Sequence, residues 1–239
     1  MRRPIMTGLV LFAAAAAIQP ARADGLIYRL PEDGTQIRYD VDLVLSAGGN
    51  ETPTKGSLTV SSVGKATVND EKCRWIEIKS ITTAEGQDHI QIIKSLIPEK
   101  ELGKGKSPLE HAVRTWLKID NNEVIEVKDF KDPQAMALNA FLAGPPKNPG
   151  ELEKVEVDGK LGKLECAGVT GDTEFEGPGG LMIAIHVENR LNEKAPFGLV
   201  NANWKFEVKN GGQTFLTGTF KLTPADTSTT ALSELPDKN

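Results

Sequence analysis

Three histidines and two cysteines are the residues of this 239-residue chain best suited to metal binding or nucleophilic catalysis: His89, His111, His186, Cys73 and Cys166. Zinc sites are recognised by close ligand pairs such as His-Glu-x-x-His on one helix face, and no such pair occurs here. A thiol nucleophile needs a local environment that lowers its pKa, and we identify no activating motif around either cysteine. The sequence therefore predicts no metal site and no catalytic residue.

Other short motifs also resemble turns more than they resemble binding or catalytic sites. The segment Gly103-Lys104-Gly105-Lys106 is too short for a phosphate-binding loop, which needs a strand before it and a helix after it. The run Asp120-Asn121-Asn122-Glu123 lacks the twelve-residue spacing of a calcium loop. The carboxylates of Glu174 and Glu176 fall on one strand face, whereas a glycosidase needs two acids across a substrate. We expect no cofactor and favour a protein that is not an enzyme, with a hydrolase of dispersed site residues as the second alternative.

The two cysteines suggest a structural role instead. In an oxidising compartment, two cysteines more often pair than stay free. A disulfide between Cys73 and Cys166 is therefore possible, and it would contribute to stability rather than to catalysis. The alternative is a pair of buried, inert thiols.

The N-terminus has the three parts of a secretory signal peptide. Arg2 and Arg3 precede an apolar run from Gly8 to Ile18, and the small-x-small triplet Ala21-Arg22-Ala23 follows. The sequence thus predicts a signal peptide at residues 1–23. No cysteine stands behind the apolar run, where a bacterial lipoprotein would carry its lipid anchor, so we expect a periplasmic or secreted protein.

Charge and hydropathy exclude further classes. Removal of residues 1–23 leaves 25 basic and 33 acidic residues, a net charge of −8. An acidic domain is a poor nucleic-acid ligand, so no nucleic-acid partner is expected. No later stretch approaches the roughly twenty apolar residues that span a bilayer, so no stable membrane insertion is expected either. The sequence leaves the oligomeric state open.

Alternating apolar and polar residues predict a mostly β protein. Residues 35–45 alternate in this way over a full strand length, and glycine, proline or Asn/Asp clusters separate the segments that follow. Because these segments succeed one another at hairpin spacing, they predict an antiparallel sheet. The further strands are expected near 58–63, 72–81, 89–97, 113–119, 124–127, 152–157, 161–169, 181–187, 199–208 and 214–222.

One helix interrupts the strands. Asp132 and Pro133 form a helix start, and an apolar run follows until Gly144 and two prolines end it. We expect an apolar helix around residues 133–143 that covers a curved antiparallel sheet, an open half-barrel. A β-sandwich is the alternative. The single domain is expected at residues 24–223, with a loosely ordered tail at 224–239.

Apolar side chains are the best candidates for function. Trp75 and Trp116 lie on separate predicted strands, and Met136 and Phe141 lie on the predicted helix. A curved sheet partly wrapped around such a helix can leave an apolar cleft. These four residues are the predicted lining of that cleft, although all of them could equally form an ordinary core.

This order of elements resembles the LolA-like family of bacterial envelope proteins. The resemblance rests on exported antiparallel hairpins, one apolar helix, and long strands near Ala195-Pro196-Phe197-Gly198. It implies an open half-barrel whose apolar cavity carries the acyl chains of lipoproteins. We therefore expect an exported binding module of the cell envelope, with a lipid, an acyl chain of a lipoprotein or another apolar ligand as its partner. A structural or protein-interaction domain of the envelope is the first alternative.

Overall fold

The computed structural model describes residues 25–84, 86–103, 105–106, 108–127, 146, 148–176 and 180–235. The predicted signal peptide at residues 1–23 and the predicted helix at residues 133–143 lie outside these ranges.

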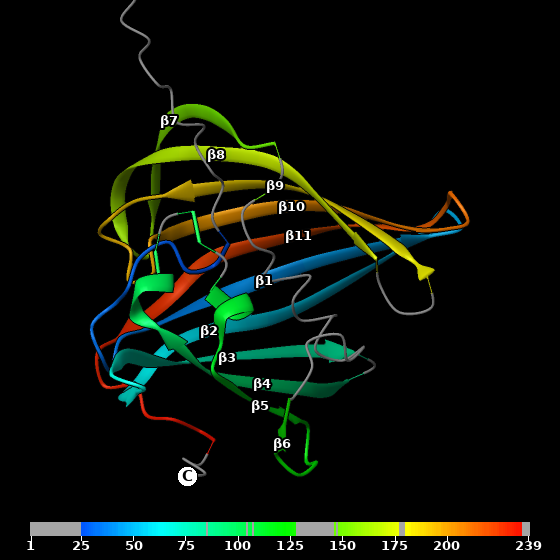
Figure 1. The fold of residues 1–239 in the computed structure, drawn as a ribbon. Helices are drawn as coiled ribbons and strands as arrows, with labels where there is room; N and C mark the ends of the chain where they lie inside the picture. Colours follow the sequence, from blue (N-terminus) through cyan, green and yellow to red (C-terminus); the bar gives the residue numbers. More distant parts are fainter. Residues whose placement is uncertain are drawn as a thin grey trace, which may run out of the picture.

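Within the described residues, the strands form one antiparallel sheet of 11 strands (Figure 1). The first meander contains β1 (Gln36–Ala47), β2 (Asn50–Val68), β3 (Glu71–Ala84), β4 (Gln87–Pro98), β5 (Arg114–Ile119) and β6 (Ile125–Glu126). The second contains β7 (Gly150–Gly159), β8 (Gly162–Glu176), β9 (Met182–Leu191), β10 (Leu199–Asn210) and β11 (Gln213–Ser228).

The two meanders join through β1 and β11, which pair along almost their whole length. Edge strands β6 and β7 do not pair with each other, so the sheet stays open. The prediction of a mostly β, antiparallel open half-barrel is confirmed. The alternative β-sandwich is wrong, because consecutive hairpins continue one sheet instead of dividing between two.

Tight turns fix the register of the long hairpins. Gly48 and Gly49 have φ angles of 58° and 83°, and Asn69 and Asp70 have φ angles of 49° and 62°. Two successive residues with positive φ are typical of a type I′ turn, whose twist matches that of the flanking strands. The first turn lets β1 pair with β2 from Ala47 and Asn50 onward, and the second lets β2 pair with β3 from Val68 and Glu71 onward.

Alternation along the strands separates two faces. We call the face that carries Ile37, Tyr39, Ile76 and Ile78 the inner face, and the other the outer face. The inner-face residues belong to one large apolar cluster that extends from β2 to β5 on one side and to β8 on the other. Because side chains of a strand alternate between faces, the residues between them point outward.

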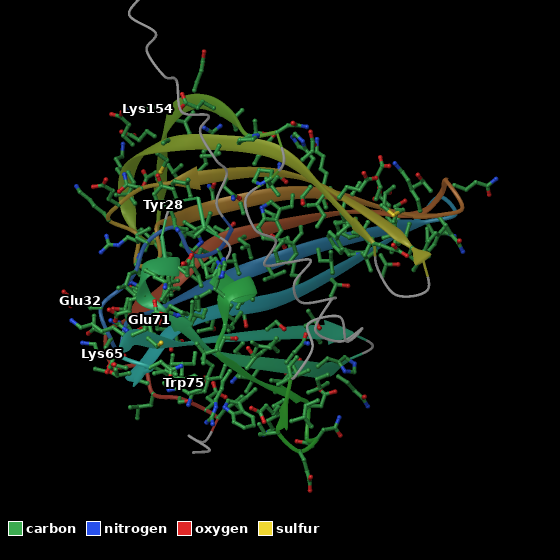
Figure 2. All side chains as sticks on the ribbon, viewed as in Figure 1. Tyr28, Glu32, Lys65, Glu71, Trp75 and Lys154 are labelled. Atoms are coloured by element: carbon green, nitrogen blue, oxygen red, sulfur yellow. The ribbon has the colours of Figure 1, made fainter. Side chains whose placement is uncertain are left out.

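One end of the inner face is filled by irregular segments, and we call it the closed end. Leu26 and Ile27 from the N-terminal segment belong to the inner cluster. So do Leu102, which follows the short helix η1 (Glu99–Glu101), and Leu109 within the short helix η2 (Pro108–His111). Figure 2 shows Tyr28, Glu32, Lys65 and Glu71 at this end, opposite the tips of the β1–β2 and β10–β11 hairpins.

Hydrogen bonds to main-chain groups hold the closed end together. The amide of Tyr28 donates to the carbonyl of Phe197 at 2.8 Å. The hydroxyl of Tyr39, fully buried, donates to the carbonyl of Leu199 at 2.9 Å, and burial raises the pKa of that phenol far above its usual value. The first bond holds the N-terminal segment against the residues just before β10, and the second holds the start of β10 against β1.

Arg74 connects three elements at the same end. Its guanidinium donates to the carbonyl of Pro31 at 2.9 Å, to Ser62 Oγ at 3.0 Å and to Glu99 Oε1 at 2.8 Å. The side chain is 5% exposed, and its Nε has no partner among the described residues. Arg74 thus joins the N-terminal segment and η1 to β3.

The C-terminal segment differs from its prediction as a loosely ordered tail from residue 224. Strand β11 continues to Ser228 because its register with β1 runs on to Gln36. Beyond it, Leu235 is 2% exposed and packs against Ile92 and Trp116. A single apolar anchor and main-chain hydrogen bonds order a segment whose composition suggested disorder.

The possible disulfide between Cys73 and Cys166 is absent, and both residues are buried free thiols. They lie on β3 and β8, six strand spacings apart in the sheet order, which corresponds to about 29 Å along the sheet. A disulfide requires Cα atoms within about 7 Å. Burial is the main cause that raises the pKa of both thiols. They are buried free thiols, as the alternative predicted, and their inertness stays a prediction.

Candidate ligand-binding face

Burial on the inner face decreases from the closed end toward the opposite end. Along β1, Ile37 and Tyr39 are fully buried, Val41 is 5% exposed, and Leu43 is half-buried. Along β9, Leu191 is 3% exposed at the closed end, and Ile183 is half-buried toward the opposite end. On β10 the decrease is interrupted, because Phe206 is half-buried while Val208, two residues farther on, is 9% exposed. On β1 and β9 the inner face has one filled end and a less buried opposite end, the open end.

Four half-buried apolar side chains mark the open end, and we call them the open-end residues: Leu43, Phe175, Ile183 and Phe206. Strand register makes three of them neighbours, and Leu43 is paired with Phe220 on the intervening β11. Phe175 is paired with Ile183 across β8 and β9, and Ile185, beside Ile183 on the same face, is paired with Phe206. They form an apolar surface continuous with the core, without a charged side chain among them.

A glycine shapes this surface. Gly218 of β11 is paired with Phe206 of β10, and an added Cβ there would meet the ring of Phe206 and lie 2.7 Å from the carbonyl oxygen of Val44. The ring of Phe206 therefore lies over the backbone of β11. Such a glycine within a strand is typical of a site where another group approaches the backbone closely.

The structure brings two of the predicted cleft residues together, but on the outer face. Trp75 and Trp116 lie on the outer face, where they pack in a small cluster with Ile92 and Leu235. They do not line the inner face, because each alternates with an inner-face residue, Ile76 or Leu117. Figure 2 shows Trp75 near the lower border of the sheet. Met136 and Phe141 lie outside the described residues, so their part in the site stays a prediction.

Sequence reasoning missed the open-end residues although a signal was present. The predicted strands contain Leu43, Ile183 and Phe206, and period-two alternation assigns these residues to the same faces as the core and places Trp75 opposite. Phe175 lies beyond the predicted strand 161–169, because β8 continues to Glu176. Trp204 does lie inside, 3% exposed, where its Nε1 donates to Asn189 Oδ1 at 2.9 Å.

The histidines stay apart. His89 is 3.5 Å from Asp120, and His111 is 3.9 Å from Glu101. His186 Nδ1 is 2.7 Å from Asp172 Oδ1, on the solvated outer face. Its Nε2 lies 3.3 Å from Thr170 Oγ1 and 3.8 Å from Glu188 Oε1.

No group of three or more His, Cys, Asp or Glu side chains in the described ranges is arranged to hold a metal ion. Among the helices that the structure describes, none is long and apolar enough to cross a membrane.

Two hollows with charged linings lie outside the apolar surface. The first, about 510 Å³, is lined by residues of β8 to β10 that include Asp172, His186 and Lys205. The second, about 500 Å³, lies beside Cys73 and Arg74 at the closed end. The first is lined by side chains of both charge signs, whereas the basic Lys65, Lys72 and Arg74 outnumber Glu99 in the second.

Comparisons with known proteins add only distant likenesses. The sequence matches no known family model and no curated protein. Among solved structures, it is similar to a DUF1329 family protein from Desulfovibrio piger, with 10% identity, a TM-score of 0.34, and coverage of 82% of this chain and 85% of that chain.

Two further structures are similar at the same level. One is a Bacteroides fragilis protein with a YmcC-like fold that is described as exported, with 10% identity, a TM-score of 0.33, and coverage of 84% and 99%. The other is a β-barrel-like protein of the DUF1849 family from Brucella abortus, with 8% identity, a TM-score of 0.25, and coverage of 84% and 98%. None of the three is described as a LolA-like carrier, so that resemblance stays a prediction.

Proposed function

We propose that the protein is an exported binding module that holds an apolar ligand, a lipid acyl chain, against the open end of its inner face. The carrying observation is the burial gradient, which ends in four half-buried apolar side chains on β1, β8, β9 and β10. Export rests on the signal peptide predicted at residues 1–23.

The physical basis is the removal of apolar surface from water. Transfer of a methylene group into an apolar environment contributes about 0.8 kcal/mol, so an acyl chain gains affinity with each group that it lays along the open-end residues. The closed end, filled by the N-terminal segment, sets how far a ligand can enter. Because no charge lies among the open-end residues, the site selects apolar chains rather than polar head groups.

Competition binding with a fluorescent fatty acid tests this proposal. Ile183→Asn places an amide on the proposed surface and should weaken binding about tenfold or more, since a polar group buried against an acyl chain costs about 1–3 kcal/mol. Ile125→Asn makes the same chemical change on β6, where the side chain is 51% exposed, and should leave the affinity unchanged.

Two outcomes would contradict the proposal. One is a folded wild-type protein that binds no fatty acid at concentrations where common lipid carriers are saturated. The other is equal weakening by Ile183→Asn and Ile125→Asn, because binding would then not depend on the open-end residues.

A further inference from the structure

A second site lies on the outer face, and the chain's own C-terminal segment occupies it. After β11 the main chain turns back, with the amide of Ala231 bonded to the carbonyl of Gly34 at 2.9 Å. Residues 233–235 then lie over β3 to β5, where Leu235 packs between Ile92 and Trp116. We call residues 229–235 the tail and the surface under it the tail site.

Two buried charged residues bind the main chain of the tail. Glu77 accepts hydrogen bonds from the amides of Glu234 and Leu235 at 3.1 and 3.3 Å, and from Ser233 Oγ at 2.8 Å. Lys94 Nζ donates to the carbonyl of Leu235 at 3.1 Å. Glu77 and Lys94 are paired across β3 and β4 and are 4% and 0% exposed. Lys94 also lies over the ring of Trp75.

This arrangement does not suit a segment whose only role is to stabilise the fold. Burying a carboxylate and an ammonium group carries a large desolvation penalty, and apolar residues of similar size usually stabilise a fold as well or better. Glu77 and Lys94 instead bind main-chain groups of a segment that belongs to no strand. Recognition of an extended main chain plus one apolar side chain is the chemistry of peptide-binding sites.

Charge around the tail site defines the peptide that it fits. Lys79 Nζ lies 2.8 Å from the carboxylate of Glu234. Arg114 and Lys118 of β5 share the outer face, because they are paired with Leu96 and Ile92 of β4. Glu126 of β6 is paired with Trp116 and shares this face as well, so the border carries both charge signs. Lys79 favours an acidic residue next to the leucine, as in the tail's own Ser233-Glu234-Leu235.

We propose that the tail site is a peptide-binding site occupied in cis, and that an extended partner peptide of the type Ser-acidic-Leu binds there by displacing the tail. The partner's serine and main chain take the hydrogen bonds to Glu77, its leucine enters the pocket between Ile92 and Trp116, and its acidic side chain pairs with Lys79. The tail then acts as an internal competitor. This inference is independent of the ligand on the inner face.

The test uses the full-length chain and a fluorescently labelled peptide with the sequence of residues 229–239. Leu235→Gly removes the apolar anchor, and Leu232→Gly makes the same change at a residue that is 86% exposed. Fluorescence anisotropy should show saturable peptide binding to Leu235→Gly that is about tenfold or more tighter than to Leu232→Gly, because the internal competitor is weakened. Wild type should resemble Leu232→Gly, with weak binding that a high peptide concentration still saturates.

Site variants identify where the peptide binds. Lys94→Met, placed in the Leu235→Gly chain, should lower the affinity for the peptide about tenfold or more, since a lost hydrogen bond to a charged group costs about 1.5–3 kcal/mol. Lys55→Met, at a lysine whose side chain is 90% exposed on β2, removes the same charge and should leave the affinity unchanged.

Several results would overturn the proposal. Hydrogen exchange that shows a released tail in Leu235→Gly, together with peptide binding no tighter than in Leu232→Gly, would show that the site does not bind peptides. A tail whose amides stay protected from hydrogen exchange in both variants, or a wild-type chain that never binds the peptide, would show that the tail is a permanent part of the fold. A full-length dimer that becomes monomeric in Leu235→Gly would assign the site to the tail of a second copy.

Discussion

Replacing Arg74 by methionine should destabilise the protein far more than any exposed arginine does. The substitution keeps most of the apolar stem but removes the hydrogen bonds to Pro31, Ser62 and Glu99. Hydrogen bonds from a charged group contribute about 1.5–3 kcal/mol each, but such values are not additive. Glu99 can recover hydration because its side chain is 24% exposed. We therefore expect a loss of about 3 kcal/mol in the free energy of unfolding.

Arg38→Met is the matched control for Arg74→Met. Arg38 lies 3.4 Å from Asp40, and the two side chains are 44% and 66% exposed. Exposed ion pairs contribute about 0–1 kcal/mol. Urea denaturation followed by tryptophan fluorescence measures both variants. If Arg74→Met loses less than about 1 kcal/mol, or no more than Arg38→Met, the closed end is not held by Arg74 and this reasoning is refuted.

Three further predictions concern the core. Gly218→Ala should destabilise the fold by about 1–3 kcal/mol in thermal or urea denaturation, because its methyl group meets the ring of Phe206 and a carbonyl oxygen; an unchanged stability would contradict the packing over β11. Burial raises the pKa of Tyr39, so its stabilising contribution is complete below the unfolded pKa of about 10 and decreases by up to about 1.4 kcal/mol per pH unit above it. Urea denaturation from pH 9 to 11.5 should therefore show a smaller alkaline loss for Tyr39→Phe than for wild type, and parallel curves would refute the assignment. Because burial also raises the pKa of Cys73 and Cys166, both thiols should react slowly with a thiol reagent when folded and rapidly in urea; rapid labelling of the folded protein would contradict their burial.

Much of the fold could be predicted from alternation and turn residues. The pattern of residues 35–45 predicts a strand, and β1 runs over Gln36–Ala47. Strand β2 is far longer than the predicted residues 58–63, because Asn50 to Gly56 pairs with β1 through main-chain hydrogen bonds while its side chains stay mostly exposed. A two-sided polar strand leaves no hydrophobic period to detect.

The candidate site was harder to predict because it depends on how strands are ordered in space. Tryptophan content suggested Trp75 and Trp116, but side-chain size does not reveal which face a residue occupies. The pairing of β1 with β11 brings the two meanders together, and no local pattern indicates it. Without that pairing, Leu43 of β1 and Phe206 of β10 could not be recognised as parts of one surface.

Native mass spectrometry of the protein isolated from the envelope of its own host tests the proposed function most directly. We predict a bound mass that is lost on denaturation and is identified as an acyl-containing lipid, and a lower occupancy in Ile183→Asn than in Ile125→Asn. A protein that carries no added mass under gentle ionisation, and that takes up no fatty acid when one is supplied, would contradict the account.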